Sequence, residues 1–255
     1  MIPFRIRIHR EYNRCYARIL RLFWQIQKKD MPCVYMFHSV VDSIEQVYSQ
    51  FAITRDSFER FIEYKVHRGE VAMDTSLLLR AIENPKKYQN HFCITFDDIY
   101  DSVYTNAYPI LKKYNIPFVI FLTDALVDTI DPWSNNPMIT SEHLFEMLSD
   151  PLCILASHGI KHIPFRNYDK EQAVFALQQS KLQLEKKYHK IIELFAFPFG
   201  RLVEVSTSAI RQVKKAGYAC GFSALDGSLL QKWWSGRWFL PRVLVGEDYI
   251  KTIVR

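Results

Sequence analysis

The amino-acid sequence predicts one α/β domain, and three observations support this. Seven short apolar segments of strand length alternate with segments of helical periodicity. The strand-like segments are apolar almost throughout, which is typical of strands that are covered on both faces of a sheet. The length of 255 residues suits a single domain of α/β-barrel size. On these grounds the sheet can be open or closed.

Residues 1–30 differ from the rest of the chain in charge. The net charge is +6, and this segment carries the excess against Glu11 and Asp30 alone. Its basic residues are Arg5, Arg7, Arg10, Arg14, Arg18, Arg21, Lys28 and Lys29. Because the remainder is close to neutral, we expect no nucleic-acid-binding surface.

Within this segment, residues 7–27 have the pattern of an amphipathic helix. The arginines recur every three or four residues, and a separate apolar face runs from Ile8 to Ile26. We expect this face to pack on the domain. The alternatives are peripheral contact with an anionic membrane surface, which the arginines and Trp24 suit, and a partner protein. We therefore divide the chain into a basic N-terminal helix at 1–30 and a larger domain at 31–255.

Three features bear on the compartment. The apolar run at 19–26 is broken by Arg21 and is followed by no small-residue cleavage site. No segment approaches the roughly 20 apolar residues of a transmembrane helix. The five cysteines are odd in number and lack C-x-x-C spacing, which favours a reduced compartment. We expect a cytoplasmic protein, which would lie at the inner face of the membrane if the membrane alternative for residues 7–27 holds.

The expected elements follow from residue 31 onwards. Strands are expected at 33–37, 92–96, 118–122, 152–156, 194–197, 219–222 and 239–245. Helices are expected at 56–67, 75–83, 102–114, 140–149, 169–188 and 205–215. Asp56 and Glu59 resemble a capping box at the start of the first helix, and Gly217 suits a left-handed C-cap after the last.

Reactive side chains collect immediately after the expected strands. These positions hold His38, Asp97, Asp98, Thr123, His158, Pro198 and Ser223. In parallel α/β sheets, the C-terminal ends of the strands meet at one edge, where loops build the active site. The longest irregular segment, residues 123–139, is rich in Asp, Asn and Pro and is expected to form a loop over this site.

Asp97, Asp98, His158 and His162 have the chemistry of a metal site. Adjacent carboxylates repel and point to opposite faces of a regular strand, so the strand has to end between them if both serve one cleft. His158 and His162 can reach one ion if the chain between them makes a helical turn. Two histidines and one carboxylate leave positions open for water and substrate, as a hydrolytic zinc site requires.

Two further residues are candidates on weaker grounds. Pro198 and Gly200 favour a tight turn in which the Phe199 N–H points outward, where it can stabilise an oxyanion. An ordinary strand-to-helix turn explains the same pattern. His38 is a candidate acid, and a hydrogen-bonded core histidine is the alternative.

The ordered set of motifs resembles the polysaccharide deacetylase family, also known as the NodB-homology domain or carbohydrate esterase family four. Ile94-Thr95-Phe96-Asp97-Asp98 with Tyr100 and Asp101 is similar to the first family motif, Ser157 to His162 to the second, and Phe197-Pro198-Phe199-Gly200 to the third. Gly217-Tyr218 and Leu240-Pro241-Arg242 resemble later segments. The resemblance covers roughly residues 31–245.

This resemblance implies a distorted (β/α)₇ barrel of the polysaccharide deacetylase type, preceded by the N-terminal amphipathic helix. It assigns Asp97 as the base, Asp98, His158 and His162 as ligands of a divalent metal, with Zn²⁺ expected, and the Phe199 N–H as the oxyanion donor. The family removes acetyl groups from sugars, so the implied substrate is an N-acetylated glycan and residues 31–255 become the catalytic domain.

Four departures from the family pattern stand out. Ile99 replaces the usual glycine, Gly159 replaces a serine or threonine, and Ala196 lies near the position of the base-orienting arginine. No histidine follows His189, so the usual C-terminal acid is absent from the sequence.

A branch of the family that resembles poly-N-acetylglucosamine deacetylases has its acid after the first strand. Phe37-His38-Ser39-Val40 is similar to that pattern, which makes His38 the implied acid. Arg242 is the candidate for the missing arginine. Because of the departures, two alternatives stay open: an inactive glycan-binding protein of the same fold, and a metal amidohydrolase of small molecules.

Overall fold

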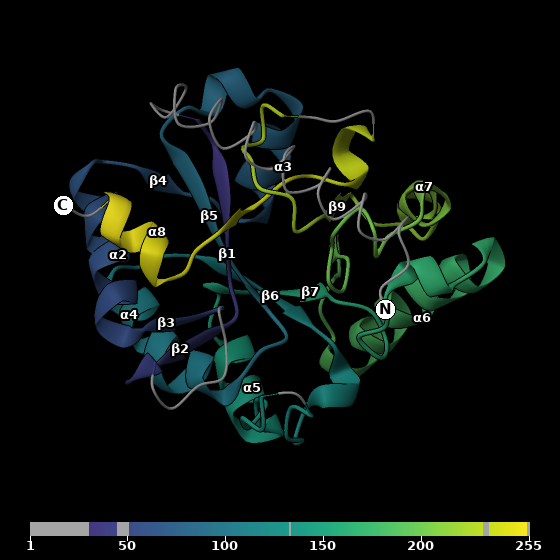
Figure 1. Cartoon of the computed structure of the whole chain (residues 1–255), viewed down its shortest axis with the longest axis horizontal. Helices are drawn as coiled ribbons and strands as arrows, with labels where there is room; N and C mark the ends of the chain where they lie inside the picture. Colours follow the sequence, from purple (N-terminus) through teal and green to yellow (C-terminus); the bar gives the residue numbers. More distant parts are fainter. Residues whose placement is uncertain (1–30, 45–50, 133, 232–234, 254–255) are drawn as a thin grey trace, which may run out of the picture.

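The computed structural model describes residues 31–44, 51–132, 134–231 and 235–253 (Figure 1). The predicted helix at 7–27 lies outside the described residues, so its existence and its membrane contact stay predictions. Among the described helices, none combines the length and the apolar character that crossing a membrane requires.

A curled parallel sheet forms the centre of the molecule. Its strands run in the order β10-β1-β5-β6-β7-β8-β9, and the short β4 pairs with β5. The bounds are β1 (Cys33–Phe37), β4 (Val71–Ala72), β5 (His91–Asp97), β6 (Phe118–Leu122), β7 (Cys153–Ser157), β8 (Leu194–Ala196), β9 (Cys220–Phe222) and β10 (Val243–Leu244). A bridge joins Phe222 of β9 to Leu240, three residues before β10, and so connects one edge of the sheet to the segment that leads into the other. The sheet is therefore the predicted distorted barrel.

Helices surround this sheet (Figure 1). Their bounds are α2 (Arg55–His67), α3 (Thr75–Glu83), α4 (Tyr108–Lys113), α5 (Ser141–Ser149), α6 (Lys170–Tyr188), α7 (Thr207–Lys215) and α8 (Glu247–Ile253). Short 3₁₀ helices lie at Pro85–Tyr88, Asp124–Leu126, Phe165–Asn167 and Gly236–Trp238. A separate pair of strands, β2 (Ser39–Val41) and β3 (Ala52–Thr54), lies beyond the end of β1.

Both faces of the sheet are buried, which explains the continuous apolar runs in the sequence. Alternate residues of β1 divide between two clusters, with Tyr35 and Phe37 in the larger cluster and Val34 in the smaller. The smaller cluster also takes Phe121 from β6 and Leu78 from α3. Because the strands of this sheet are parallel, their C-terminal ends all lie at one edge, where the site is located.

Two local predictions need correction. The N-cap of α2 is Thr54, whose side chain accepts from the Ser57 N–H, and Asp56 lies inside the first turn. The expected helix at 102–114 is a π-helix (Val103–Ala107) followed by α4. Pro109 lacks an N–H and cannot continue an α-helical ladder, and at this junction the Tyr108 N–H donates to the Val103 carbonyl, one residue further back than in an α-helix.

Candidate metal and active site

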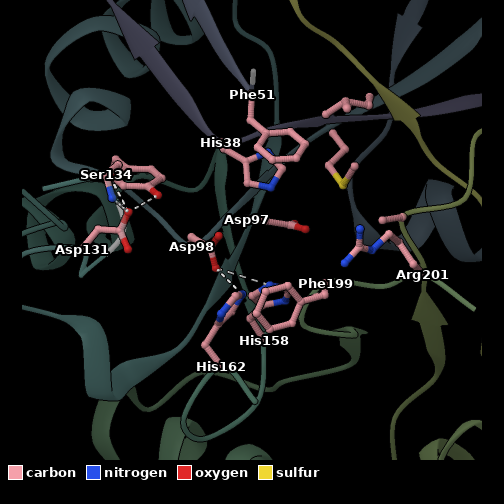
Figure 2. A pocket seen from close by; sticks show the side chains of 14 residues that line it. His38, Phe51, Asp97, Asp98, Asp131, Ser134, His158, His162, Phe199 and Arg201 are labelled. Carbon is pink, nitrogen blue, oxygen red and sulfur yellow. Dashed lines mark hydrogen bonds and ion pairs between the residues drawn. The ribbon is translucent and has the colours of Figure 1, made fainter. Parts of the chain in front are cut away.

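One cavity of about 820 Å³ at this edge contains six of the seven predicted site residues. Its lining consists of Met36, His38, Phe51, Asp97, Asp98, Tyr100, Asp131, Ser134, His158, His162, Phe199, Arg201, Ala224 and Leu244. The seventh, Arg242, is buried beside Asp97. Figure 2 shows His38 on one side of the two aspartates and the paired imidazoles on the other.

The end of β5 separates the two aspartates as the sequence requires. The strand stops at Asp97, and Asp98 and Ile99 follow in the left-handed region with φ values of 63° and 43°. This sharp turn lets neighbouring carboxylates face the same cavity while contacting different partners.

Asp98 lies against both imidazoles. Its Oδ1 is 2.9 Å from His162 Nε2 and 3.5 Å from His158 Nε2. Ligand atoms of all three residues lie within 4.8 Å of one another. Two ligands about 2.1 Å from a tetrahedral zinc ion are about 3.4 Å apart, so the cluster has the right spacing.

The buried Asp98 Oδ1 has no partner with hydrogen-bond geometry among the described residues. Burial raises the pKa of Asp98, but His162 and His158 lower it further, so it lies below its ordinary value. An anionic oxygen that two imidazoles approach without good hydrogen-bond geometry is a suitable ligand for a divalent cation.

The backbone fixes His158 in the form that binds a metal. Its Nδ1 lies 2.9 Å from the Ala196 carbonyl, which can only accept, so Nδ1 carries the proton and Nε2 faces the cavity with its lone pair. Burial lowers the pKa of His158 to about 4. The imidazole is therefore neutral at pH 7, as metal coordination requires.

The expected helical turn between His158 and His162 is wrong. This segment is a loop in which Gly159 and His162 have φ values of 85° and 49°. These two left-handed residues reverse the chain and bring the second imidazole back to the first, with ring centroids 5.2 Å apart. The His162 ring also packs against Phe199 at 4.7 Å.

Asp97 forms a bidentate ion pair with Arg242. Both contacts between guanidinium nitrogens and carboxylate oxygens are 2.7 Å, and the two residues are 3% and 1% exposed. Arg242 Nε also donates to the Ser223 carbonyl. Burial raises the pKa of Asp97, but Arg242 and His158 lower it more, so Asp97 is a carboxylate at neutral pH.

His38 and Phe199 complete the set. Burial lowers the pKa of His38, and its Nδ1 has no hydrogen-bond partner within the described part of the chain. Phe199 has a φ of 59° and Gly200 one of 56°, which confirms the tight turn. The structure thus places the predicted residues together.

Eight lining residues were not among the predicted site residues, and five of them carry polar or aromatic side chains: Phe51, Tyr100, Asp131, Ser134 and Arg201. Asp131 and Ser134 lie in the segment that we expected to cover the site. Tyr100 belongs to the first motif and Arg201 follows the third, so both had a signal in their position. Phe51 had no such signal in the sequence. Only the fold brings its ring to His38, with ring centroids 4.8 Å apart.

The comparisons with known proteins identify a family whose model covers most of this site. The family model for polysaccharide deacetylase matches residues 84–221, a range with Asp97, Asp98, both clustered histidines and Phe199. A poly-β-1,6-N-acetyl-D-glucosamine N-deacetylase of Staphylococcus aureus is 25% identical over 213 residues, which are 80% of this chain and 71% of that protein.

Two solved structures share the fold. IcaB from Ammonifex degensii superposes with a TM-score of 0.72 at 22% identity, covering 88% of this chain and 96% of that one. The Streptococcus pyogenes deacetylase PplD superposes with a TM-score of 0.71 at 20% identity, covering 88% and 98%.

The turn at Phe199 gives a first prediction. A Cβ at Gly200 would lie 2.4 Å from the Ala224 backbone nitrogen, whereas one at Gly69, also left-handed, would meet nothing within 4 Å. We expect Gly69→Ala to cost about 1 kcal/mol of unfolding free energy from backbone conformation alone. Gly200→Ala should cost at least about 2 kcal/mol more, because the backbone has to shift. Urea denaturation of both variants measures this, and equal costs would contradict the tight approach.

Proposed function

This chain belongs to the polysaccharide deacetylase family, and from that premise we propose that it is a metal-dependent hydrolase that removes N-acetyl groups from a sugar in an N-acetylated glycan. The cluster of Asp98, His158 and His162 beside the buried Asp97 carries the proposal. The similarity to poly-β-1,6-N-acetyl-D-glucosamine N-deacetylases supports an N-acetylated polymer or oligomer, or a glycan precursor, as the substrate.

Asp98, His158 and His162 are the proposed metal ligands, with Zn²⁺ as the proposed ion. Two imidazoles and a carboxylate are a common zinc set that leaves room for water and substrate. When bound, the cation supplies a Lewis acid that polarises the acetyl carbonyl and acidifies water.

Asp97 is the proposed base. Its low pKa keeps it ionised at pH 7, and Arg242 occupies one lone-pair direction on each oxygen. Each oxygen therefore retains a lone pair that can accept a proton from the attacking water. Arg242 fixes the orientation of this carboxylate and takes the place of the arginine that the third motif lacks.

His38 is the proposed acid for the leaving nitrogen. Phe37 pairs with Phe96 in the register of β1 and β5, so the next residues on each strand, His38 and Asp97, reach the cavity together. Burial lowers the pKa of His38, while Asp97 and Asp98 raise it in part. A protonated imidazole with a lowered pKa is a stronger proton donor.

The Phe199 N–H is the proposed donor to the oxyanion that forms on the acetyl carbon. Phe199 lines the cavity within a tight turn, in which the Gly200 N–H donates to the Pro198 carbonyl at 2.7 Å. A preorganised donor of this kind typically contributes about 3 kcal/mol to the transition state.

Metal content and acetate release test the assignment together. We expect His158→Ala to lose bound zinc and activity, because a ligand is missing. Asp97→Asn should keep the zinc and lose at least about 100-fold in kcat, because the base is missing. His143→Ala is the control, since His143 also contacts a carboxylate, Asp101 at 2.6 Å, but does not line the cavity.

These two measurements also separate the alternatives. Zinc without acetate release from any N-acetylated oligosaccharide would favour the inactive glycan-binding protein. Release from small amides alone would favour the amidohydrolase. Full turnover by Asp97→Asn would reject this base.

The Asp97–Arg242 pair predicts a change in the pH profile. Without the guanidinium, burial dominates and the pKa of Asp97 rises, so the base becomes protonated at a higher pH. We expect the acid limb of kcat/KM to move up by at least about one pH unit in Arg242→Gln and by less in Arg242→Lys, which keeps the charge. Arg237→Gln, which removes a surface ion pair with Glu83, is the control. An unmoved acid limb in Arg242→Gln would show that Asp97 does not control it.

A further inference from the structure

One wall of the cavity consists of Tyr100, Asp131 and Ser134, which we call the acceptor wall. Figure 2 shows Asp131 and Ser134 on one side of the cavity and Arg201 on the other, with the catalytic side chains between them. The proposed mechanism uses none of these three wall residues.

Asp131 organises the wall. It is 7% exposed, and its Oδ2 accepts from the Tyr100 hydroxyl at 3.0 Å and from the Ser134 N–H at 2.9 Å. The Ser134 hydroxyl donates to the same oxygen. These bonds direct the protons of both hydroxyl groups towards the carboxylate.

The direction of these bonds decides what the wall can bind. A hydroxyl group has one proton and two lone pairs. Tyr100 and Ser134 donate their protons to Asp131, so each hydroxyl has lone pairs left for the cavity. The Ser134 hydroxyl also approaches the Tyr100 oxygen, and the Asn136 N–H contacts Ser134 Oγ at 3.4 Å. The wall therefore accepts hydrogen bonds, and its ligand has to be a donor.

The wall is held at a fixed place relative to the metal ligands. Tyr100 lies two residues after Asp98 and bridges to Met138 on the returning end of the loop. The Ile139 N–H donates to the Ile99 carbonyl at 2.9 Å, and the Asp101 N–H donates to the Pro137 carbonyl at 3.0 Å. A ligand group that meets the wall is thus positioned with little further ordering.

We propose that the acceptor wall binds hydroxyl groups of the same sugar whose acetamide faces Asp98, and so selects a sugar over other acetylated compounds. This inference rests on the proposed function. A pyranose carries O–H donors on the ring carbons near its acetamide, and the wall lies in the same cavity as the metal ligands. A site built to accept from a hydroxyl group discriminates against substrates that lack it.

The test compares Tyr100→Phe with Tyr104→Phe as a matched control. Each change removes one hydroxyl group that donates to a carboxylate, but the Tyr104 hydroxyl contacts Glu146 outside the cavity lining. The substrates are penta-N-acetylated oligo-β-1,6-glucosamine and 4-nitrophenyl acetate, an activated ester without sugar hydroxyls.

For the oligosaccharide, we expect Tyr100→Phe to raise KM about fivefold and leave kcat within about twofold, the loss of one neutral hydrogen bond. The same variant should hydrolyse 4-nitrophenyl acetate like the wild type, and Tyr104→Phe should match the wild type on both substrates. Equal losses on both substrates would show a structural role, and an unchanged KM would show that the wall does not contact the sugar. Either result overturns the proposal.

A second measurement separates this proposal from the proposed function. If the wild type releases no acetate, the function fails, and calorimetric titration of the zinc-loaded protein with the same oligosaccharide then tests the wall alone. About fivefold weaker binding by Tyr100→Phe than by Tyr104→Phe supports it, and equal binding overturns it.

Discussion

Two adjacent carboxylates at the end of β5, Asp97 buried and Asp98 half-buried, are kept ionised, and the rest of the site depends on which groups stabilise each charge. A buried charge costs several kcal/mol unless it is paired and hydrogen-bonded. Asp97 is compensated by a guanidinium that contacts both of its oxygens. Asp98 turns away through a left-handed backbone and meets two imidazoles instead. One carboxylate is therefore suited to accept a proton and the other to hold a cation.

The barrel serves this division of charge. Arg242 immediately precedes β10, in the segment that links β9 to β1 and completes the barrel. Its guanidinium lies 5.2 Å from the Phe121 ring, so apolar packing and cation–π attraction support its position. The closing segment thus contributes to the fold and to the orientation of the proposed base at once.

Much of this arrangement was predictable because the strands are short, apolar and covered on both faces. β1 and β6 have their predicted bounds. His38 and Thr123, which directly follow these strands, therefore lie at the predicted edge of the sheet. The strands β2, β3 and β4 escaped prediction, because segments of two or three residues carry no periodicity.

The loop at His158 and the wall at Asp131 were harder for a different reason. Side-chain spacing in the sequence cannot distinguish a helical turn from a loop with two left-handed residues. The hydrogen bonds of Asp131 depend on which way a long connection folds back over the sheet. The family resemblance suggested roles for Asp97 and Arg242. Their contact joins residues 145 positions apart, so no local pattern in the sequence could predict it.

Two departures from the family pattern, at Ile99 and Gly159, can be explained by the backbone conformation. Ile99 has a φ of 43°, a conformation that glycine adopts without strain and a β-branched residue adopts at a cost of about 1–2 kcal/mol. Its side chain is fully buried, which offsets that cost. Gly159 has a φ of 85°, so the absence of a side chain there permits the reversal that brings His162 to Asp98.

We propose that the side chains of Asp98, His158 and His162 coordinate one divalent ion. Anomalous diffraction at the zinc absorption edge, from crystals of the zinc-loaded protein, tests it most directly. One strong peak is expected about 2.1 Å from Asp98 Oδ1, His158 Nε2 and His162 Nε2. A zinc-loaded crystal whose peak lies elsewhere, with the two imidazoles bonded to the carboxylate alone, would contradict it.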